Sequence, residues 1–420
     1  MFTTWGALTG LAIAIFLIVR KATPAYALVL GALAGGLLGG GGLTETVSAM
    51  ISGTQSMMPS VLRILTSGIL AGALVKTGSA ERIADSIVRM LGTRFALVAI
   101  ALAAMIVTAV GVFVDIAVIT VAPVALAVGK RAGLPVSSLL LAMVGGGKAG
   151  NVISPNPNTI AAADAFKVDL TALMMKNIVP ALCALAVTVL LSTWLARKGR
   201  KDAAVCSVVN GKDETAKDLP NIVSAVAGPL VVIALLALRP LCGIAVDPLV
   251  ALPAGGLVSI IICGHWRNTA EYCEFGLSKV IGVSILLIGT GAVAGIVKNS
   301  GLNADMISVL NACHLPAFAL APLSSVLLSG ATASTTAGVT IASQTFSGAL
   351  AQAGIPALSA AAMLHAGGTI FDALPHGSFF HATAGAVGMS VKDRLKLFPY
   401  GTLVGTTTTV VSVIVYLLGF

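Results

Sequence analysis

Two apolar stretches of this chain are interrupted in a way that rules out a continuous helix. They run from 132 to 159 and from 353 to 378. Each begins Ala-Gly-(Leu/Ile)-Pro, carries a Gly-Gly pair eleven residues after that proline, and then becomes polar and proline-rich. Proline lacks an amide donor and glycine weakens a helix. Broken backbone survives in lipid only where protein or a polar cavity covers it, so two matching breaks predict the binding site of a secondary transporter.

The composition places these breaks in a membrane. Hydrophobic residues make up 57% of the chain and charged residues only 10%, whereas a soluble chain carries about 25% charge. The net charge of +9 falls mostly in short loops, which indicates membrane topology and not nucleic-acid binding. The six cysteines show no metal-ligand spacing, so we expect packing roles for them and no metal site.

The two halves of the chain repeat each other. Residues 67–78 (SGILAGALVKTG) align without gaps on residues 290–301 (TGAVAGIVKNSG). The distance from this anchor to the proline that opens each broken segment is nearly the same in both halves, and such constant spacing is typical of an internal repeat.

We therefore predict an all-α polytopic membrane protein with two inverted-topology repeats. Each repeat has about five transmembrane helices, one re-entrant hairpin and one broken helix. In the second repeat, two of the expected spans are 279–298 and 399–419. The predicted units are the first repeat, 1–196 (hairpin 95–129, broken helix 135–165), a cytoplasmic linker, 197–219, and the second repeat, 220–420 (hairpin 316–350, broken helix 354–388).

The basic residues set the expected orientation. If both hairpins enter and leave on one side and the N-terminus lies outside, most of the 25 Lys and Arg residues fall on the inner side, as the positive-inside rule requires. An odd number of crossings then separates each segment from its copy, which inverts the second repeat. This predicts a bacterial inner-membrane protein with both termini outside.

Four sequence stretches carry a family resemblance. FVDIAVITVAPVALAV, GGGKAGNVISPNPNTIAAADAF, LSGATASTTAGVTIAS and FDALPHGSFFHATAGAVGMSVKDRLKLF resemble the gluconate permease family and, more distantly, the ion transporter superfamily that includes divalent anion–sodium symporters. The resemblance covers roughly 25–400. It implies proton-coupled symport of a small hydroxylated carboxylate, such as gluconate or 3-hydroxybutyrate, by a homodimer with a scaffold and a moving transport domain, an elevator-type mechanism. The sequence of the first break differs from that of familiar gluconate permeases, because it contains Lys148 and several asparagines.

Lys148 is a charge in the middle of an expected span. An ammonium at that depth costs about 2.5–3.5 kcal/mol, so it must face a polar site. Two interpretations stay open. Lys148 pairs with a substrate carboxylate, or a fixed acid such as Asp115 neutralises it.

Other polar residues at the breaks and hairpin tips are candidates for substrate binding. Amides and hydroxyls offer hydrogen bonds to carboxylate and hydroxyl oxygens, and a helix restarting near Asn158 would direct its positive end toward an anion. The alternative is that these groups only repair the broken backbone. Besides Lys148, the candidates are Asn151, Ser154, Asn156, Asn158 and Thr159 in the first break, Ser334, Thr335 and Thr336 at the second hairpin tip, and His376, Gly377 and Ser378 in the second break.

Three titratable residues are candidates for proton coupling. Asp115 lies at the expected tip of the first hairpin, and Asp372 and His376 lie in the second break. Buried carboxylates and histidines exchange protons near neutral pH. The structural alternative is that each aspartate caps backbone or pairs with Lys148 or a histidine.

Three other classes of function compete with proton symport. A sodium-coupled organic-anion symporter of the same architecture fits the same residues, and a channel also remains open. An intramembrane enzyme is disfavoured, since the chain has neither a GxGD nor an HExxH motif. We expect no cofactor other than a coupling ion. A proton is the favoured coupling ion, and a sodium ion is the alternative.

Overall fold

The computed structural model describes residues 2–199, 219–302 and 316–419, and four single positions between 302 and 316 (304, 305, 308 and 312). Within these residues the fold is all-α, and the only β-type pairing among them is one isolated bridge between Phe2 and Ser300. Most of the predicted linker 197–219 lies outside the described residues. Four described helices are long and apolar enough to cross a membrane by themselves, and shorter apolar helices accompany them. The prediction of an all-α polytopic membrane protein is confirmed.

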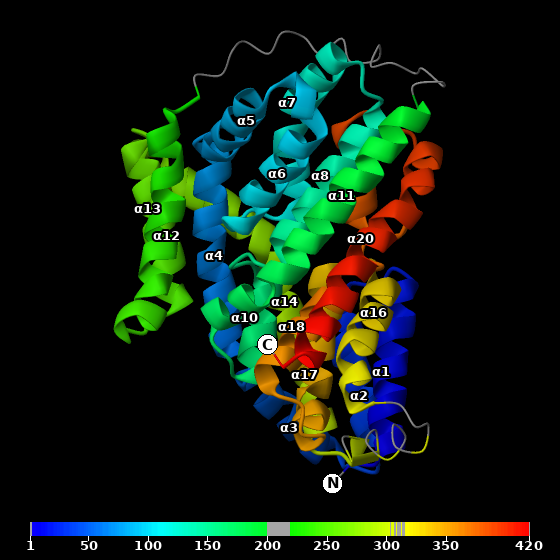
Figure 1. Cartoon of the computed structure of the whole chain (residues 1–420). Helices are drawn as coiled ribbons and strands as arrows, with labels where there is room; N and C mark the ends of the chain where they lie inside the picture. Colours follow the sequence, from blue (N-terminus) through cyan, green and yellow to red (C-terminus); the bar gives the residue numbers. More distant parts are fainter. Residues whose placement is uncertain are drawn as a thin grey trace.

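One group of helices packs around a central pair, α4 and α14. A helical hairpin from the first half, α1–α2, lies on α14, and the corresponding hairpin from the second half, α12–α13, lies on α4 (Figure 1). This reciprocal packing is what a repeat predicts. The group consists of α1 (Thr4–Val19), α2 (Pro24–Leu38), α3 (Leu43–Gln55), α4 (Met58–Lys76), α12 (Ile222–Cys242), α13 (Pro248–Ile262), the short 3₁₀ helix η2 (Trp266–Asn268) and α14 (Thr269–Lys298); we call it the central group.

The second group contains the hairpins and the broken helices. From the first half it takes α5 (Ser79–Leu91), η1 (Thr93–Phe95), α6 (Ala96–Ala109), α7 (Val114–Ala132), α8 (Val136–Asn151), α9 (Pro157–Phe166), α10 (Leu170–Lys176) and α11 (Ile178–Gly199). From the second half it takes η3 (Ala317–Ala319), α16 (Leu320–Thr332), α17 (Thr335–Gln352), α18 (Ala357–Gly367), α19 (Ser378–Ala386) and α20 (Val391–Leu417). We call it the hairpin group.

Both predicted hairpins and both predicted breaks are present. The hairpins are α6–α7 and α16–α17, and the broken helices are α8–α9 and α18–α19. The first hairpin lies in the upper half of the molecule and the second in the lower half (Figure 1), as an inverted repeat requires. The second arm of each hairpin contacts the other half's post-break helix, α7 with α19 and α17 with α9. The hairpin of each half therefore packs against the broken helix of the other half.

Local chemistry fixes the ends of these helices. Pro157 is the first residue of α9, where its missing amide costs nothing, and Asn156 caps the helix by accepting from two backbone amides. Ser334 caps α17 in the same way. Gly133, whose backbone is in the left-handed helical conformation, ends α7, and the chain then turns into the first broken helix.

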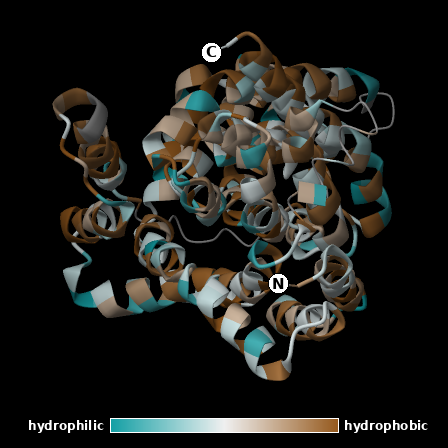
Figure 2. Ribbon diagram, turned by 90° about the horizontal axis from the view of Figure 1, so that it is seen from below, coloured by the Kyte–Doolittle hydropathy of each residue, from teal (hydrophilic) through white to brown (hydrophobic). Residues whose placement is uncertain are grey.

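The exterior of the molecule is apolar as well as its interior. Figure 2 shows hydrophobic residues along the outer helices, and large side chains such as Trp5 and Leu241 are almost four-fifths exposed. A soluble protein rarely exposes so much contiguous apolar surface. Lipid is the solvent that suits this surface.

Three helical segments differ from the expected spans. Helix α3 is absent from the prediction because its sequence, LTETVSAMISGTQ, is too polar to register as a span. Helix α14 begins at Thr269 and not near 279, because the charges of Glu271, Glu274 and Lys279 interrupt the apolar window without interrupting the helix. For the same reason the charged start of α20 lies at Val391, ahead of the expected 399.

Candidate functional site

A cavity of about 550 Å³ lies where both hairpin tips and both breaks meet. A face of α14 and the start of α2 complete its wall, so both halves and both groups of helices contribute. The lining residues are Phe113, Val114, Asp115, Asn151 and Asn158 from the first half, Thr332, Ala333, Ser334, Thr335, Thr336, Ala337, Asp372, Ser378 and Phe379 from the second, and Thr23, Pro24, Ala25, Lys279, Gly282, Val283, Ile285 and Leu286 from α2 and α14.

Four helices of the hairpin group begin at this cavity. The wall contains the first residues of α7, α17 and α19 and the second residue of α9. Two of these helices, α7 and α19, have no side-chain cap. A helix N-terminus presents unpaired amides and about half a positive charge. Four of them around one cavity contribute a positive potential, which the carboxylate of Asp115 in the first turn of α7 partly offsets.

Lys148 forms a buried ion pair with Asp372. Its Nζ lies 2.6 Å from Asp372 Oδ1, and the two side chains are 1% and 7% exposed. The same ammonium donates to the carbonyls of Thr369, at 2.7 Å, and Gly401, at 3.2 Å. Thr335 Oγ1 donates to the other carboxylate oxygen of Asp372, at 2.8 Å. A fixed acid therefore neutralises Lys148, and the suggestion that Asp115 is that acid is wrong, because the second break brings Asp372 closer.

The pair divides its members between the cavity and the protein behind it. Asp372 lines the cavity, whereas Lys148 is not part of the wall. Lys148 extends from the first broken helix into the second break and toward α20. It thus joins the two halves at the level of the site.

The asparagines of the first break brace one another. Asn151 Oδ1 accepts from Asn156 Nδ2 at 2.7 Å and from Asn158 Nδ2 at 3.1 Å, and Asn156 Oδ1 caps α9. Thr159 donates to the carbonyl of Ser154 at 2.6 Å. Much of this network repairs broken backbone, as the structural alternative predicts.

Asn158 keeps one acceptor free for a ligand. It is 5% exposed, it lines the cavity, and its Oδ1 has no hydrogen-bond partner among the described residues. A buried acceptor without a partner is costly. A hydroxyl donor in the cavity would satisfy it.

The predicted site residues separate into two sets. Asp115, Asn151, Asn158, Ser334, Thr335, Thr336, Asp372 and Ser378 line the cavity. Lys148, Ser154, Asn156, Thr159 and Gly377 are buried and lie outside its wall, and His376 is exposed, with Nε2 3.3 Å from the carbonyl oxygen of Ala331. Three members of the second set, Ser154, Asn156 and Thr159, take part in hydrogen bonds that satisfy backbone groups at the first break.

Lys279 is a charged cavity residue that the sequence analysis did not include among the site candidates. Hydropathy alone places it on the inner side, at the start of the span expected at 279–298. The available signal was its spacing from Gly282, Val283 and Leu286, which follows i, i+3, i+4 and i+7 and so places all four on one helical face.

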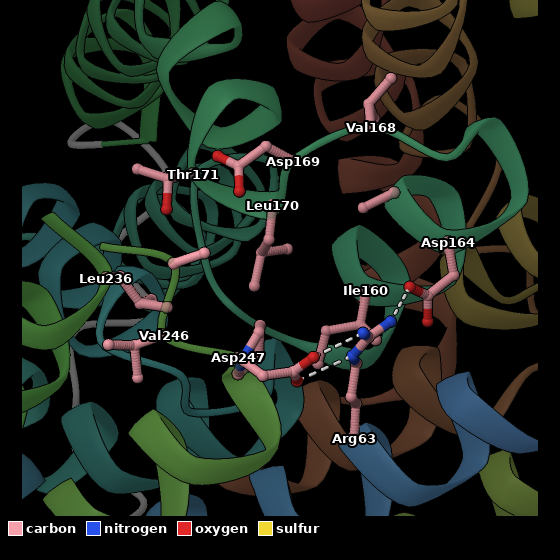
Figure 3. Close-up of a pocket in the computed structure, with 13 residues that line it drawn as sticks. Arg63, Ile160, Asp164, Val168, Asp169, Leu170, Thr171, Leu236, Val246 and Asp247 are labelled. Carbon is pink, nitrogen blue, oxygen red and sulfur yellow. Dashed lines mark hydrogen bonds and ion pairs between the residues drawn. The ribbon is translucent and has the colours of Figure 1, made fainter. Parts of the chain in front are cut away.

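A second, smaller pocket of about 180 Å³ surrounds Arg63 on α4. Figure 3 shows the guanidinium between two carboxylates, Asp247 before α13 and Asp164 on α9. Arg63 meets Asp247 through two parallel contacts of 2.9 and 2.6 Å, and Ser60 donates to Asp164 at 2.5 Å. Arg63 thereby ties the hairpin group to the central group at the end of α4 remote from Lys76.

Comparison with known proteins decides the family. The model of the GntP family permeases matches residues 3–419, nearly the whole chain. The chain belongs to the GntP permease family. An uncharacterized transporter of Haemophilus influenzae is 53% identical over 411 residues, which cover 98% of this chain and 97% of that protein. The family resemblance drawn from the break and hairpin motifs is confirmed.

More distant relatives agree with this assignment. A gluconate permease of Zymomonas mobilis is 22% identical over 360 residues, 80% of each chain. The crystal structure of the YdaH transporter of Alcanivorax borkumensis superposes with a TM-score of 0.65 at 18% identity, covering 90% of each chain. The fold of this GntP permease is thus that of a membrane transporter, and its relatives are described as permeases and transporters, not as enzymes.

Proposed function

We propose that this GntP permease is a proton-coupled symporter of a small hydroxylated carboxylate, gluconate-like or 3-hydroxybutyrate-like. The observation that carries the proposal is the convergence of four helix N-termini from both halves on one cavity. Their summed field favours an anion, and the free acceptor of Asn158 suits a hydroxyl donor. The gluconate permease among the relatives supports the same substrate class.

Asp115 is the better candidate for the coupling proton. It lines the cavity, and no lysine or arginine forms an ion pair with it among the described residues. Asp372 is less suited, because Lys148 and the hydroxyl of Thr335 already contact both of its carboxylate oxygens. His376 lies away from the cavity wall and has no evident part in proton transfer.

The proposed motion is of the elevator type. The hairpin group, with its hairpins and broken helices, would carry the site past the central group, which would hold the interface of a homodimer. In this proposal the protein lies in the bacterial inner membrane with both termini outside, as the distribution of basic residues favours.

Uptake into proteoliposomes tests the substrate and the coupling ion together. We expect an inward proton gradient, without sodium, to drive accumulation of radiolabelled D-gluconate or (R)-3-hydroxybutyrate. Accumulation that needs a sodium gradient would overturn proton coupling and favour the sodium symporter. Downhill flux that neither saturates nor shows counterflow would indicate a channel.

Replacing the proposed proton carrier sharpens this experiment. Asp115→Asn should abolish accumulation driven by a proton gradient, while exchange of internal for external substrate persists, since exchange needs no net proton movement. Asp85→Asn, on α5 and outside the cavity wall, is the matched control and should retain accumulation. Unchanged proton-driven uptake by Asp115→Asn would place the proton site elsewhere.

A further inference from the structure

The walls of the cavity contain a cation that the paired charges of the breaks do not neutralise. Among the described residues, Lys279 is the only lysine or arginine that lines the cavity. Lys148 forms an ion pair with Asp372, and the buried Arg394 lies outside the cavity wall. A substrate carboxylate entering the cavity therefore finds a single ammonium within it.

Lys279 lies well inside α14 and not in a loop at the end of the helix, so its side chain is placed to contact a ligand in the cavity. It lies about 15 Å along α14 from Thr269, at 1.5 Å per residue, inside a candidate span of high hydropathy. A charged side chain within an apolar span is costly unless it faces water or a partner. Lys279 is exposed toward the cavity, and no carboxylate lies within ion-pair distance of it among the described residues.

Two nearby groups interact with the ammonium without occupying its hydrogen-bond donors. Its Nζ lies 4.8 Å from the centre of the Phe275 ring, one turn earlier on α14, a cation–π contact that restricts the side chain and leaves its donors available. Asp115 is near enough for a coulombic interaction but makes no direct contact. When Asp115 carries a proton, this competing attraction disappears.

The neighbouring glycine provides room for a ligand. A Cβ added at Gly282 would meet no atom within 4 Å, although other glycines of α14, such as Gly276, are packed against backbone. Gly282 is one turn beyond Lys279 on the same face and also lines the cavity. The space in front of Lys279 is therefore open to a small molecule.

We propose that Lys279, on the central group, binds the substrate carboxylate, while Asn158 Oδ1, on the hairpin group, accepts from a substrate hydroxyl. This inference rests on the proposed function and deepens it by naming the anion-binding residue. The substrate would bridge the two groups of helices in this conformation. Proton binding at Asp115 would strengthen the hold of Lys279 on the carboxylate, which links the two cargoes.

Binding to acid and neutral analogues tests the assignment. D-gluconate and D-gluconamide are titrated against the purified protein in detergent at pH 7, with (R)-3-hydroxybutyrate and its amide as a second pair. We expect the wild type to prefer the acid, and Lys279→Gln to weaken acid binding roughly ten- to a hundredfold while amide binding changes little, because a charge-assisted hydrogen bond is lost. Lys279→Arg should restore part of the preference.

The control and the contrary outcomes are distinct. Lys298→Gln, at the far end of α14 and outside the wall, should bind both compounds as the wild type does. Equal acid binding by wild type and Lys279→Gln would overturn the assignment and leave the proposed function standing. Failure of the wild type to bind any acid of the panel would overturn the proposed function itself.

Discussion

At the scale of single residues, the site depends on one buried ion pair that links the two halves of the chain. Lys148 and Asp372 come from different halves, and their side chains are only 1% and 7% exposed. Breaking a buried pair leaves an uncompensated charge, whereas removing both charges is far less costly. The pair is therefore a structural element as well as a part of the cavity.

Burial of this ion pair predicts the stability of charge variants. Lys148→Met should lower the free energy of unfolding by about 3–5 kcal/mol, because Asp372 is left charged and buried. The double variant Lys148→Met/Asp372→Asn should recover most of that loss. Thermal unfolding in detergent measures both. A single variant as stable as the wild type would show that the pair contributes nothing to folding.

At the scale of helices, close approach of backbones holds the central group together. A Cβ on Gly276 of α14 would lie 1.9 Å from the carbonyl oxygen of Gly68 on α4. Small residues permit this contact in lipid, where no hydrophobic effect drives helices together. Two of the glycine pairs that match between 67–78 and 290–301, Gly68 with Gly291 and Gly72 with Gly295, lie in these two helices.

The crossing predicts different outcomes for two glycines of the same helix. Gly276→Val should destabilise the protein by about 1–3 kcal/mol through overpacking, because backbone cannot move aside as a flexible side chain would. Gly282→Ala, with open space around it, should unfold within a degree or two of the wild type. Loss of the folded, monodisperse fraction on size-exclusion chromatography reports the first effect. Equal stability of the two variants would contradict the tight crossing.

The sequence predicted the breaks and hairpins because their signals are local. Pro135 precedes the first residue of α8, and Pro155 and Pro157 mark the break itself, whereas Gly146 and Gly147 lie inside α8, so the chain breaks only after Asn151. The partner of Lys148 was not fixed by the sequence, because it depends on how the second break folds over the first. Lys279 was missed for a related reason: hydropathy windows cannot separate a charge that ends a helix from one that faces a cavity inside it.

At the scale of the whole molecule, Arg63 closes the interface between the two groups of helices at one end. Its guanidinium holds Asp164 of α9 and Asp247 before α13, and its hydrogen bonds keep the pKa of Asp247 below the ordinary value. If the hairpin group moves, these contacts must break in every cycle. They would stabilise the conformation described above against the alternative one.

A cross-link at this interface tests the motion. Ser60 and Asp164 touch across it, so Ser60→Cys/Asp164→Cys in a background without native cysteines should form a disulfide on oxidation. We expect the oxidised protein to lose uptake and the reduced protein to regain it. Ser60→Cys alone, treated identically, controls for oxidation. Full uptake by the cross-linked form would show that α9 stays fixed to α4 during transport.

The long sequence separation between Lys148 and its partners has a consequence for biosynthesis. The chain must place this lysine in the bilayer about 220 residues before the second break exists, an interval of about 10–45 s at ordinary rates of translation. During that time the first half carries an ammonium with neither its counter-ion nor its carbonyl ligands. The nascent permease must therefore keep its first broken helix near water, or beside the insertion machinery, until the second half emerges to receive it.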